Sequence, residues 1–132
     1  INDISVQRIQ MYKILVVEDN ADNLAVLEAF LEDDYTLVNA EDGKVGLEMA
    51  ILERPDLILM DISLPEMDGT EVLAEIRRIE GIKNTPTIAL TAHAMVGDKE
   101  KYLALGFEAY VSKPILDDEE LIELIESLIK GA

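Results

Sequence analysis

The chain has 132 residues, 49% of them hydrophobic, which suits one domain with a full hydrophobic core. It carries 28 acidic against 11 basic residues, a formal net charge of −17, which argues against nucleic acid as a partner because phosphate backbones are bound by clustered Lys and Arg. The absence of cysteine excludes disulfides and thiolate sites and fits a cytoplasmic location, and no apolar stretch approaches the roughly 20 residues of a membrane span, so no membrane partner is expected.

Residues 1–10 precede Met11, which resembles a natural start. They mix apolar and polar residues and have neither a basic start nor a long apolar centre, so they do not predict a signal peptide. We interpret residues 1–10 as a leader, a linker or a sequence added for expression. The functional domain is then expected to span residues 11–132.

Five short runs of β-type character alternate with segments of helical spacing. This alternation predicts a parallel sheet with helices on both faces, and right-handed crossovers limit the topology to a few arrangements. The third run is apolar at successive positions, as expected for a central strand that is covered on both sides. The predicted strands are residues 13–17, 36–40, 57–61, 87–90 and 109–111.

The helical segments carry their own start and stop signals. Asn20 is a predicted N-cap, and further helices are expected after Asp42-Gly43 and after Gly69-Thr70. Gly106 is a predicted helix end. The apolar residues at helical spacing are Leu24, Leu27 and Leu31, then Leu47, Ala50 and Ile51, then Val72, Leu73, Ile76 and Ile79, then Tyr102, Leu103 and Leu105, and finally Leu121, Ile122, Ile125, Leu128 and Ile129.

Acidic residues stand at the carboxyl ends of two predicted strands. Asp61 closes the third run, and Glu18-Asp19 follows the first. Ligands bind at this edge of open α/β sheets, and two carboxylates about 4 Å apart repel by about 4 kcal/mol at an effective dielectric near 20. Oxygen ligands without Cys or a nearby His suit Mg²⁺, with Mn²⁺ as a second choice. The alternative is that Glu18 and Asp19 only cap the next helix.

Two more residues at strand ends complete a possible phosphoryl site. Thr91 follows the fourth run, and Lys113 follows the fifth with Pro114 directly after it. Taken singly, each has an ordinary interpretation as a strand-end Thr or a surface Lys. Together with the acids they describe a site in which Asp61 is a carboxylate nucleophile, while Mg²⁺ and Lys113 neutralise the oxygens of the transferring group.

This pattern resembles the receiver domain of bacterial two-component response regulators over about residues 12–129. The resemblance implies an α/β, doubly wound five-stranded parallel sheet of strand order 2-1-3-4-5, the flavodoxin-like receiver fold. The matching motifs are Glu18-Asp19, Asp61 with Pro65-Glu66-Met67-Asp68-Gly69, Thr91-Ala92 and Lys113-Pro114.

The resemblance also implies a function in phosphorelay signalling. Asp61 would be the phosphoacceptor for a phosphohistidine on a histidine kinase or histidine phosphotransfer protein, and output would go to a downstream protein target. Thr91 would bind a phosphoryl oxygen, and Lys113 would pair with it. The metal ligands would be Glu18, Asp19, Asp61 and the backbone carbonyl of Ser63.

Several further roles follow from the resemblance. Tyr110 would be a switch aromatic, near the surface and mobile before phosphorylation. Pro114 would follow a cis bond, and Gly69 would be structural. Ser63 and His93 would border the path of attacking water and tune the phosphoryl lifetime, although His93 is equally an exposed loop residue without a role. The helix after Asn20, with Ala21, Leu24 and Ala25, would dock the phosphodonor, and the chain would be a monomer or a weak phosphorylation-dependent dimer.

Three other functions fit the sequence less well. A Mg²⁺-dependent phosphatase with an Asp nucleophile would need a second acid where Ser63 stands. A flavodoxin-like redox protein would need a phosphate loop after the first strand, where the sequence is acidic. A receiver-like module that signals without phosphorylation would lack Asp61 or Lys113. We therefore expect no enzyme activity beyond self-phosphorylation and self-dephosphorylation, in a free-standing regulator or the receiver of a hybrid kinase.

Overall fold

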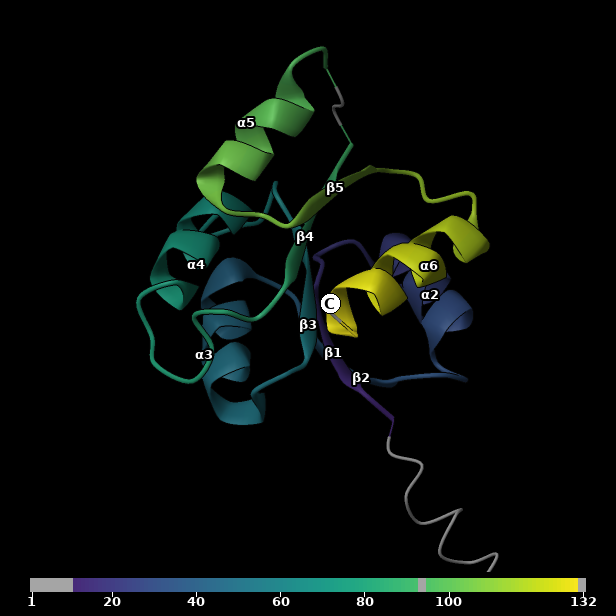
Figure 1. Cartoon of the computed structure of the whole chain (residues 1–132), viewed down its shortest axis with the longest axis horizontal. Helices are drawn as coiled ribbons and strands as arrows, with labels where there is room; N and C mark the ends of the chain where they lie inside the picture. Colours follow the sequence, from purple (N-terminus) through teal and green to yellow (C-terminus); the bar gives the residue numbers. More distant parts are fainter. Residues whose placement is uncertain (1–10, 93–94, 131–132) are drawn as a thin grey trace, which may run out of the picture.

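The computed structural model describes residues 11–92 and 95–130, in which strands and helices alternate along the chain (Figure 1). Within these residues no helix combines the length and apolar character needed to cross a membrane. The strands are β1 (Lys13–Val17), β2 (Thr36–Ala40), β3 (Leu57–Asp61), β4 (Thr87–Thr91) and β5 (Ala109–Ser112). The helices are α2 (Ala21–Leu31), α3 (Gly43–Glu53), α4 (Gly69–Ile76), α5 (Asp98–Leu105) and α6 (Asp118–Ile129).

The strands form one parallel sheet in the order β2-β1-β3-β4-β5, which confirms the predicted fold class and strand order. Every residue of β3 is buried, as the apolar sequence from Leu57 to Met60 predicts for a central strand, and the acidic Asp61 at its end is buried too. The register pairs Val17 of β1 with Met60 of β3. The residues that follow these two, Glu18 and Asp61, are therefore brought to the same edge of the sheet.

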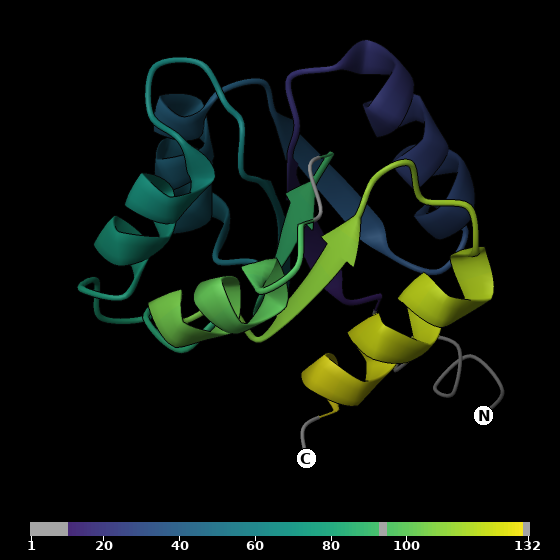
Figure 2. The same ribbon diagram turned by 90° about the horizontal axis from the view of Figure 1, so that it is seen from above.

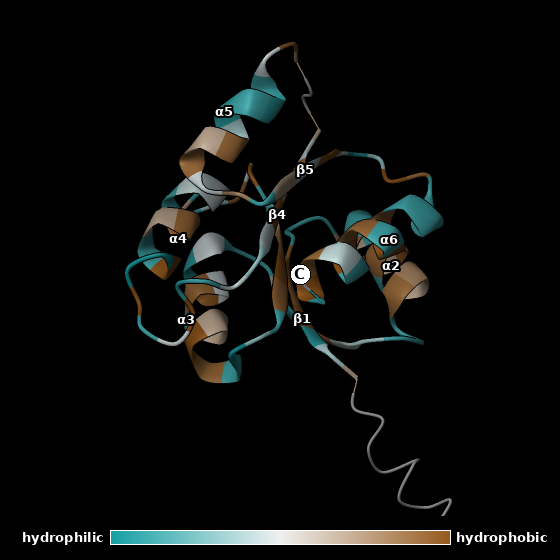
Figure 3. Cartoon of the chain, in the orientation of Figure 1, coloured by the Kyte–Doolittle hydropathy of each residue, from teal (hydrophilic) through white to brown (hydrophobic). Residues whose placement is uncertain are grey.

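Helices cover both faces of the sheet. Figure 2 shows α2 and α6 on one side and α3, α4 and α5 on the other. Successive strand residues point to opposite faces, so Ile58 packs with the α3–α5 layer and Leu59 with the α2–α6 layer. Figure 3 shows the hydrophobic colouring of the central strands between these layers. Each fully buried Leu or Ile contributes about 1.5–3 kcal/mol relative to exposure, so both layers are firmly held to the sheet.

The helix ends follow the signals in the sequence. The side-chain oxygen of Asn20 accepts a hydrogen bond from the Asn23 amide at 2.9 Å, and Asp42 accepts one from the Val45 amide at 2.8 Å. Gly106 ends α5 with a φ of 111°, a left-handed conformation that glycine adopts at little cost. The predicted cap at Asn20 and the predicted helix end at Gly106 are thus in place, and Asp42 caps the helix that was expected after it.

Several predicted details differ in the structure. Ile79, predicted on the apolar stripe of the helix after Gly69-Thr70, lies beyond α4, because the helix ends at Ile76 and the chain turns there. β4 extends through Thr91 and β5 through Ser112, each one residue beyond the apolar run, because backbone pairing continues into the polar residues. Ile51, predicted to share the buried face of α3, is exposed. Ala50 is buried as predicted, and Gly43 and Gly46 are buried with it, because α3 lies too close to its neighbours for larger side chains at the two glycines.

The start of α4 carries a capping box that we expect to matter for stability. Asp68 accepts from the amides of Thr70 and Glu71, and the Glu71 side chain accepts from the Asp68 amide. Burial alone would raise the pKa of Asp68, but these hydrogen bonds outweigh it and lower the pKa below 3.8. We expect Asp68→Ala to lower the free energy of unfolding by about 1 kcal/mol at pH 7.

The same substitution has a predicted pH dependence. Because the pKa of Asp68 is lower in the folded than in the unfolded chain, its stabilisation is present above the unfolded value and is lost as pH falls through the folded value. Urea unfolding of wild type and variant should therefore show a difference at pH 7 that shrinks below about pH 4. A difference that grows under acid conditions would contradict this explanation.

Candidate functional site

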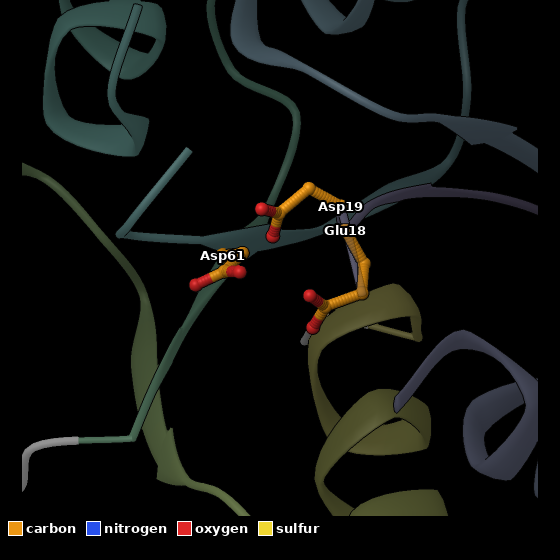
Figure 4. Close-up of side chains that lie close together, drawn as sticks. All are labelled: Glu18, Asp19 and Asp61. Atoms are coloured by element: carbon orange, nitrogen blue, oxygen red, sulfur yellow. The ribbon is translucent and has the colours of Figure 1, made fainter. Parts of the chain in front are cut away.

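Three acidic side chains gather at the carboxyl edge of the sheet. Glu18 and Asp19 follow β1, Asp61 ends β3, and one carboxylate oxygen from each lies within 4.8 Å of the others. Figure 4 shows them converging from these two segments. Glu18 and Asp61 are only 1% and 2% exposed, whereas Asp19 is open to solvent. The predicted acid cluster is therefore partly inside the protein and reachable from one side.

Lys113 reaches into this cluster from the end of β5. Its Nζ lies 3.1 Å from Oε1 of Glu18 and 3.1 Å from Oδ2 of Asp61, so one ammonium group pairs with both buried acids. The backbone amide of Lys113 donates to the Thr91 carbonyl at 2.7 Å, and the bond between Lys113 and Pro114 is cis. The lysine is thereby held by the neighbouring strand end while its side chain crosses to β1 and β3.

Backbone amides complete the hydrogen bonding of the buried acids. The Asn20 amide donates to Oε2 of Glu18 at 3.1 Å, and the Ser63 amide donates to Oδ1 of Asp61 at 3.1 Å. Each carboxylate therefore has one oxygen held by the adjacent loop and the other near Lys113. This arrangement sets the direction of both carboxyl groups.

The cluster carries more negative than positive charge. The pKa of Asp61 is raised, first by burial and then by the hydrogen bond and negative charge of Glu18, and Lys113 offsets only part of this. Burial by itself lowers the pKa of Lys113, but the hydrogen bonds and charges of Asp61 and then Glu18 raise it overall. Three carboxylates around one ammonium group leave an excess of negative charge, which favours the binding of a further cation.

The donor set fits a small divalent ion. Mg²⁺ binds oxygen at about 2.0–2.1 Å, so ligands on its opposite sides lie about 4 Å apart. The oxygens of Glu18, Asp19 and Asp61 lie within 4.8 Å, close to that spacing. Carboxylate and carbonyl oxygens are the ligands such a cation prefers, and the chain has no cysteine to offer a thiolate.

Of the other predicted site residues, the structure places most near this edge. Thr91 is buried at the end of β4, next to the strand that Asp61 ends, and Ser63 is exposed in the loop after β3. Gly69 is buried at the start of α4, where its amide donates to the Ile62 carbonyl. His93 lies outside the described residues.

Tyr110 differs from the expectation of a near-surface side chain. It is half-buried on β5, its ring stacks on that of Tyr102 with centroids 5.7 Å apart, and its hydroxyl is buried without a hydrogen-bond partner within the described part of the chain. The ring turns inward because Tyr102 of α5 and the core beside it offer apolar contact. Burial, then the charge of Asp98 and the nearby Tyr102, raise the pKa of the Tyr110 hydroxyl.

The sequence did not reveal two features of the loop after β3. Glu66 has a φ of 71°, a left-handed conformation that is uncommon for a non-glycine residue. Gly43, interpreted only as part of a helix start, lies against the backbone of Met67 in this loop. The glycine itself was the only available signal, because the contact joins segments that are far apart in the chain.

A doubly wound parallel sheet with three acids and a lysine converging at its carboxyl edge defines the receiver class of signalling domains. Comparison with known proteins agrees, since residues 14–126 match the model of the response regulator receiver domain. The chain belongs to the response regulator receiver domain family, and it is a receiver domain of two-component phosphorelay signalling.

Relatives and solved structures support this assignment. The chain is 40% identical over 120 residues to the polar-differentiation response regulator DivK of Brucella anthropi, covering 90% of this chain and 97% of the relative. It resembles the receiver domain of the sensor histidine kinase PA1611 from Pseudomonas aeruginosa PAO1, with a TM-score of 0.84, 38% identity, and coverage of 92% and 100%. That structure holds a magnesium ion in its active-site cleft. Chemotaxis protein CheY4 of Vibrio cholerae matches with a TM-score of 0.80, 29% identity, and coverage of 89% and 98%.

Proposed function

We propose that Asp61 accepts a phosphoryl group from a phosphohistidine on a histidine kinase or histidine phosphotransfer protein and passes the signal to a downstream protein. The observation that carries this proposal is the position of Lys113, whose ammonium group lies 3.1 Å from both Glu18 and Asp61. An aspartate buried beside a cation and a second acid is poised to hold an additional anionic group once the charges are balanced.

The proposed reaction is a direct transfer. A carboxylate oxygen of Asp61 forms a bond to phosphorus as the bond between phosphorus and the donor imidazole nitrogen breaks, and the imidazole keeps the electron pair. Lys113 donates a hydrogen bond to an oxygen of the transferring group, and the Thr91 hydroxyl donates to another. Mg²⁺, or Mn²⁺ in its place, would be held by the acid cluster and would supply positive charge that neutralises the phosphoryl oxygens.

The residues proposed to hold the metal are those of the acid cluster. Glu18 and Asp19 come from the end of β1, and Asp61 comes from β3. The backbone carbonyl of Ser63 adds a further oxygen from the loop after β3. The chemistry of this chain is then limited to phosphorylation and dephosphorylation of Asp61, without turnover of small-molecule esters.

Phosphorylation would act on the face formed by α5, β5 and α6. The new group brings a charge of about −2 to the end of β3 and attracts the Thr91 hydroxyl. Thr91 would move toward the phosphoryl group, and the half-buried Tyr110 on the adjacent strand is the side chain proposed to respond to the movement of Thr91. The result is a population shift between two packings, which a downstream protein distinguishes by binding one of them more tightly.

The acceptor chemistry is tested by incubating the chain with acetyl phosphate and Mg²⁺ and measuring intact mass. We expect one added phosphoryl group that is removed by hydroxylamine, as an acyl phosphate should be, and no addition when EDTA removes the metal. Addition that resists hydroxylamine would place the phosphoryl group on a different kind of side chain and would contradict the proposal.

The phosphodonor is proposed to dock beside the site, on α2 and the segment after β5. A hollow of about 110 Å³ between these elements includes Val26, Leu27 and Leu116 among its lining residues. Val26 and Leu116 expose apolar surface next to Lys113. An apolar side chain of the donor helix could pack here while its phosphohistidine faces Asp61.

This docking surface gives a prediction that separates binding from chemistry. We expect Leu116→Glu to slow transfer from a histidine phosphotransfer protein by about 10-fold or more, as loss of an apolar anchor does. Labelling by acetyl phosphate should stay unchanged, because the buried acids are held by Asn20, Ser63 and Lys113 and not by Leu116. Leu52→Glu is the matched control, since Leu52 is 74% and Leu116 is 86% exposed, but Leu52 lies on α3. Equal transfer rates in both variants would rule out this docking site.

A further inference from the structure

The first turn of α3 touches both segments that deliver the acids. A Cβ atom added at Gly43 would overlap the carbonyl oxygen of Met67, and it would lie 2.8 Å from the carbonyl carbon of that residue. A Cβ added at Gly46, one turn further along, would lie 2.9 Å from Cγ1 of Val17. Val17 is the residue before Glu18, and Met67 belongs to the loop that follows Asp61.

The contact at Gly43 is with backbone, so it cannot be relieved by a side-chain rotation. The loop that it meets is short and internally bonded, with the Ser63 amide on Asp61 and the Met67 amide on the Pro65 carbonyl at 2.7 Å. Glu66, the neighbour of Met67, already holds a left-handed φ of 71°. A loop fixed in this way would pass a displacement at Met67 to Ser63 rather than absorb it.

We propose that Gly43 is a positioning residue for the metal site: its missing side chain lets α3 pack against the loop after β3 and so sets the place of the Ser63 carbonyl relative to the acids. This inference rests on the proposed function, because it takes Ser63 and the acid cluster as the Mg²⁺ ligands. The three atoms nearest to a Cβ at Gly43 all belong to Met67, so its effect is transmitted through the loop backbone.

The test is calorimetric titration of Mg²⁺ into wild type, Gly43→Ala and a matched glycine variant, Gly106→Ala. Replacing Gly106 should also destabilise the fold, because its φ is 111°. A Cβ at Gly106 would lie 3.6 Å from Cδ2 of Leu73, an ordinary contact distance, and away from the acids. We expect Gly43→Ala to bind Mg²⁺ about 10-fold more weakly, as changes beside metal ligands do, and Gly106→Ala to bind as wild type does.

A second readout needs no metal. In metal-free samples the amide resonance of Ser63, which reports its hydrogen bond to Asp61, should shift in Gly43→Ala and stay in place in Gly106→Ala. Wild-type Mg²⁺ affinity in Gly43→Ala would overturn the positioning role. If wild type itself shows no saturable Mg²⁺ binding, the proposed function fails and this inference fails with it.

A double variant covers the case in which Gly43→Ala does not fold. Adding Glu66→Gly permits the loop backbone to move away from the new methyl group, because glycine accepts many more backbone conformations. We expect Gly43→Ala with Glu66→Gly to fold and to bind Mg²⁺ more weakly than Glu66→Gly alone, since the new methyl group still displaces Met67 and part of that displacement reaches Ser63. Equal Mg²⁺ affinity in these two variants would overturn the proposal.

Discussion

Asp61→Asn should take up no phosphoryl group from either acetyl phosphate or a phosphohistidine donor, while the fold is retained. The amide keeps the shape of the carboxylate, and its one oxygen can still accept from the Ser63 amide while its NH2 group replaces the oxygen that faces Lys113, so the packing at the end of β3 is preserved. It lacks the negatively charged oxygen that attacks phosphorus. Intact mass after incubation with each donor and Mg²⁺ is the measurement.

The same variant should be more stable than wild type without metal. Removing one of three crowded negative charges relieves electrostatic repulsion. For two carboxylates about 4 Å apart at an effective dielectric near 20, this repulsion is at most about 4 kcal/mol. Mg²⁺ should then stabilise Asp61→Asn less than wild type, because one ligand has lost its charge. Urea unfolding in EDTA and in excess Mg²⁺ gives both values.

Asp56→Asn is the matched control for this prediction. Asp56 stands just before β3, at the opposite edge of the sheet, where its carboxylate accepts from the Lys13 amide at 2.8 Å. Phosphoryl uptake should be normal in this variant. Labelling that persists in Asp61→Asn would move the acceptor to another residue and would remove the basis of the proposed reaction.

Lys113→Ala should separate phosphoryl transfer from metal binding. Loss of a hydrogen-bond donor aimed at developing negative charge costs about 100-fold or more in rate, so labelling by acetyl phosphate should slow by at least that factor. Mg²⁺ binding should persist or become tighter, because the ammonium group no longer competes for Glu18 and Asp61. Measuring the labelling rate and the Mg²⁺ affinity on one sample tests both the slower transfer and the retained metal binding.

Stability should also respond to this substitution in a metal-dependent way. Without Mg²⁺, removing Lys113 leaves Glu18 and Asp61 buried and unpaired, which we expect to cost about 3–5 kcal/mol. Excess Mg²⁺ should restore part of this loss. The control is Lys130→Ala, whose exposed pair with Glu126 should be worth less than about 1 kcal/mol. Wild-type labelling rates in Lys113→Ala would contradict the role assigned to the lysine.

The strands are a feature that could be predicted from neighbouring residues alone. The apolar runs predicted five strands whose bounds match the structure, except that β4 and β5 each continue for one polar residue. The helix cap at Asn20 was predicted because the side-chain oxygen that satisfies the first amides belongs to the cap itself. Such features depend on residues within a few positions of one another.

The positions of the Ile51 and Tyr110 side chains could not be predicted from neighbouring residues alone. The spacing of Ile51 suited a buried helix face, yet glycines occupy that face because α3 approaches β1 and the loop after β3 too closely for a side chain. Tyr110 was expected near the surface, yet its ring packs on Tyr102 of another element. Both outcomes depend on how closely separate elements approach, which residue type alone does not specify.

The sequence by itself determined which polar residues stand at the carboxyl ends of the strands, and hence that acids and a lysine share one edge of a parallel sheet. Tertiary structure decided that Lys113 reaches Glu18, 95 residues away in the chain, and Asp61 at the same time. It also decided that the backbone at Gly43 meets that of Met67. The reason is physical: periodicity and end signals act over a few residues, whereas contacts across the sheet depend on strand register and helix packing summed over the whole domain.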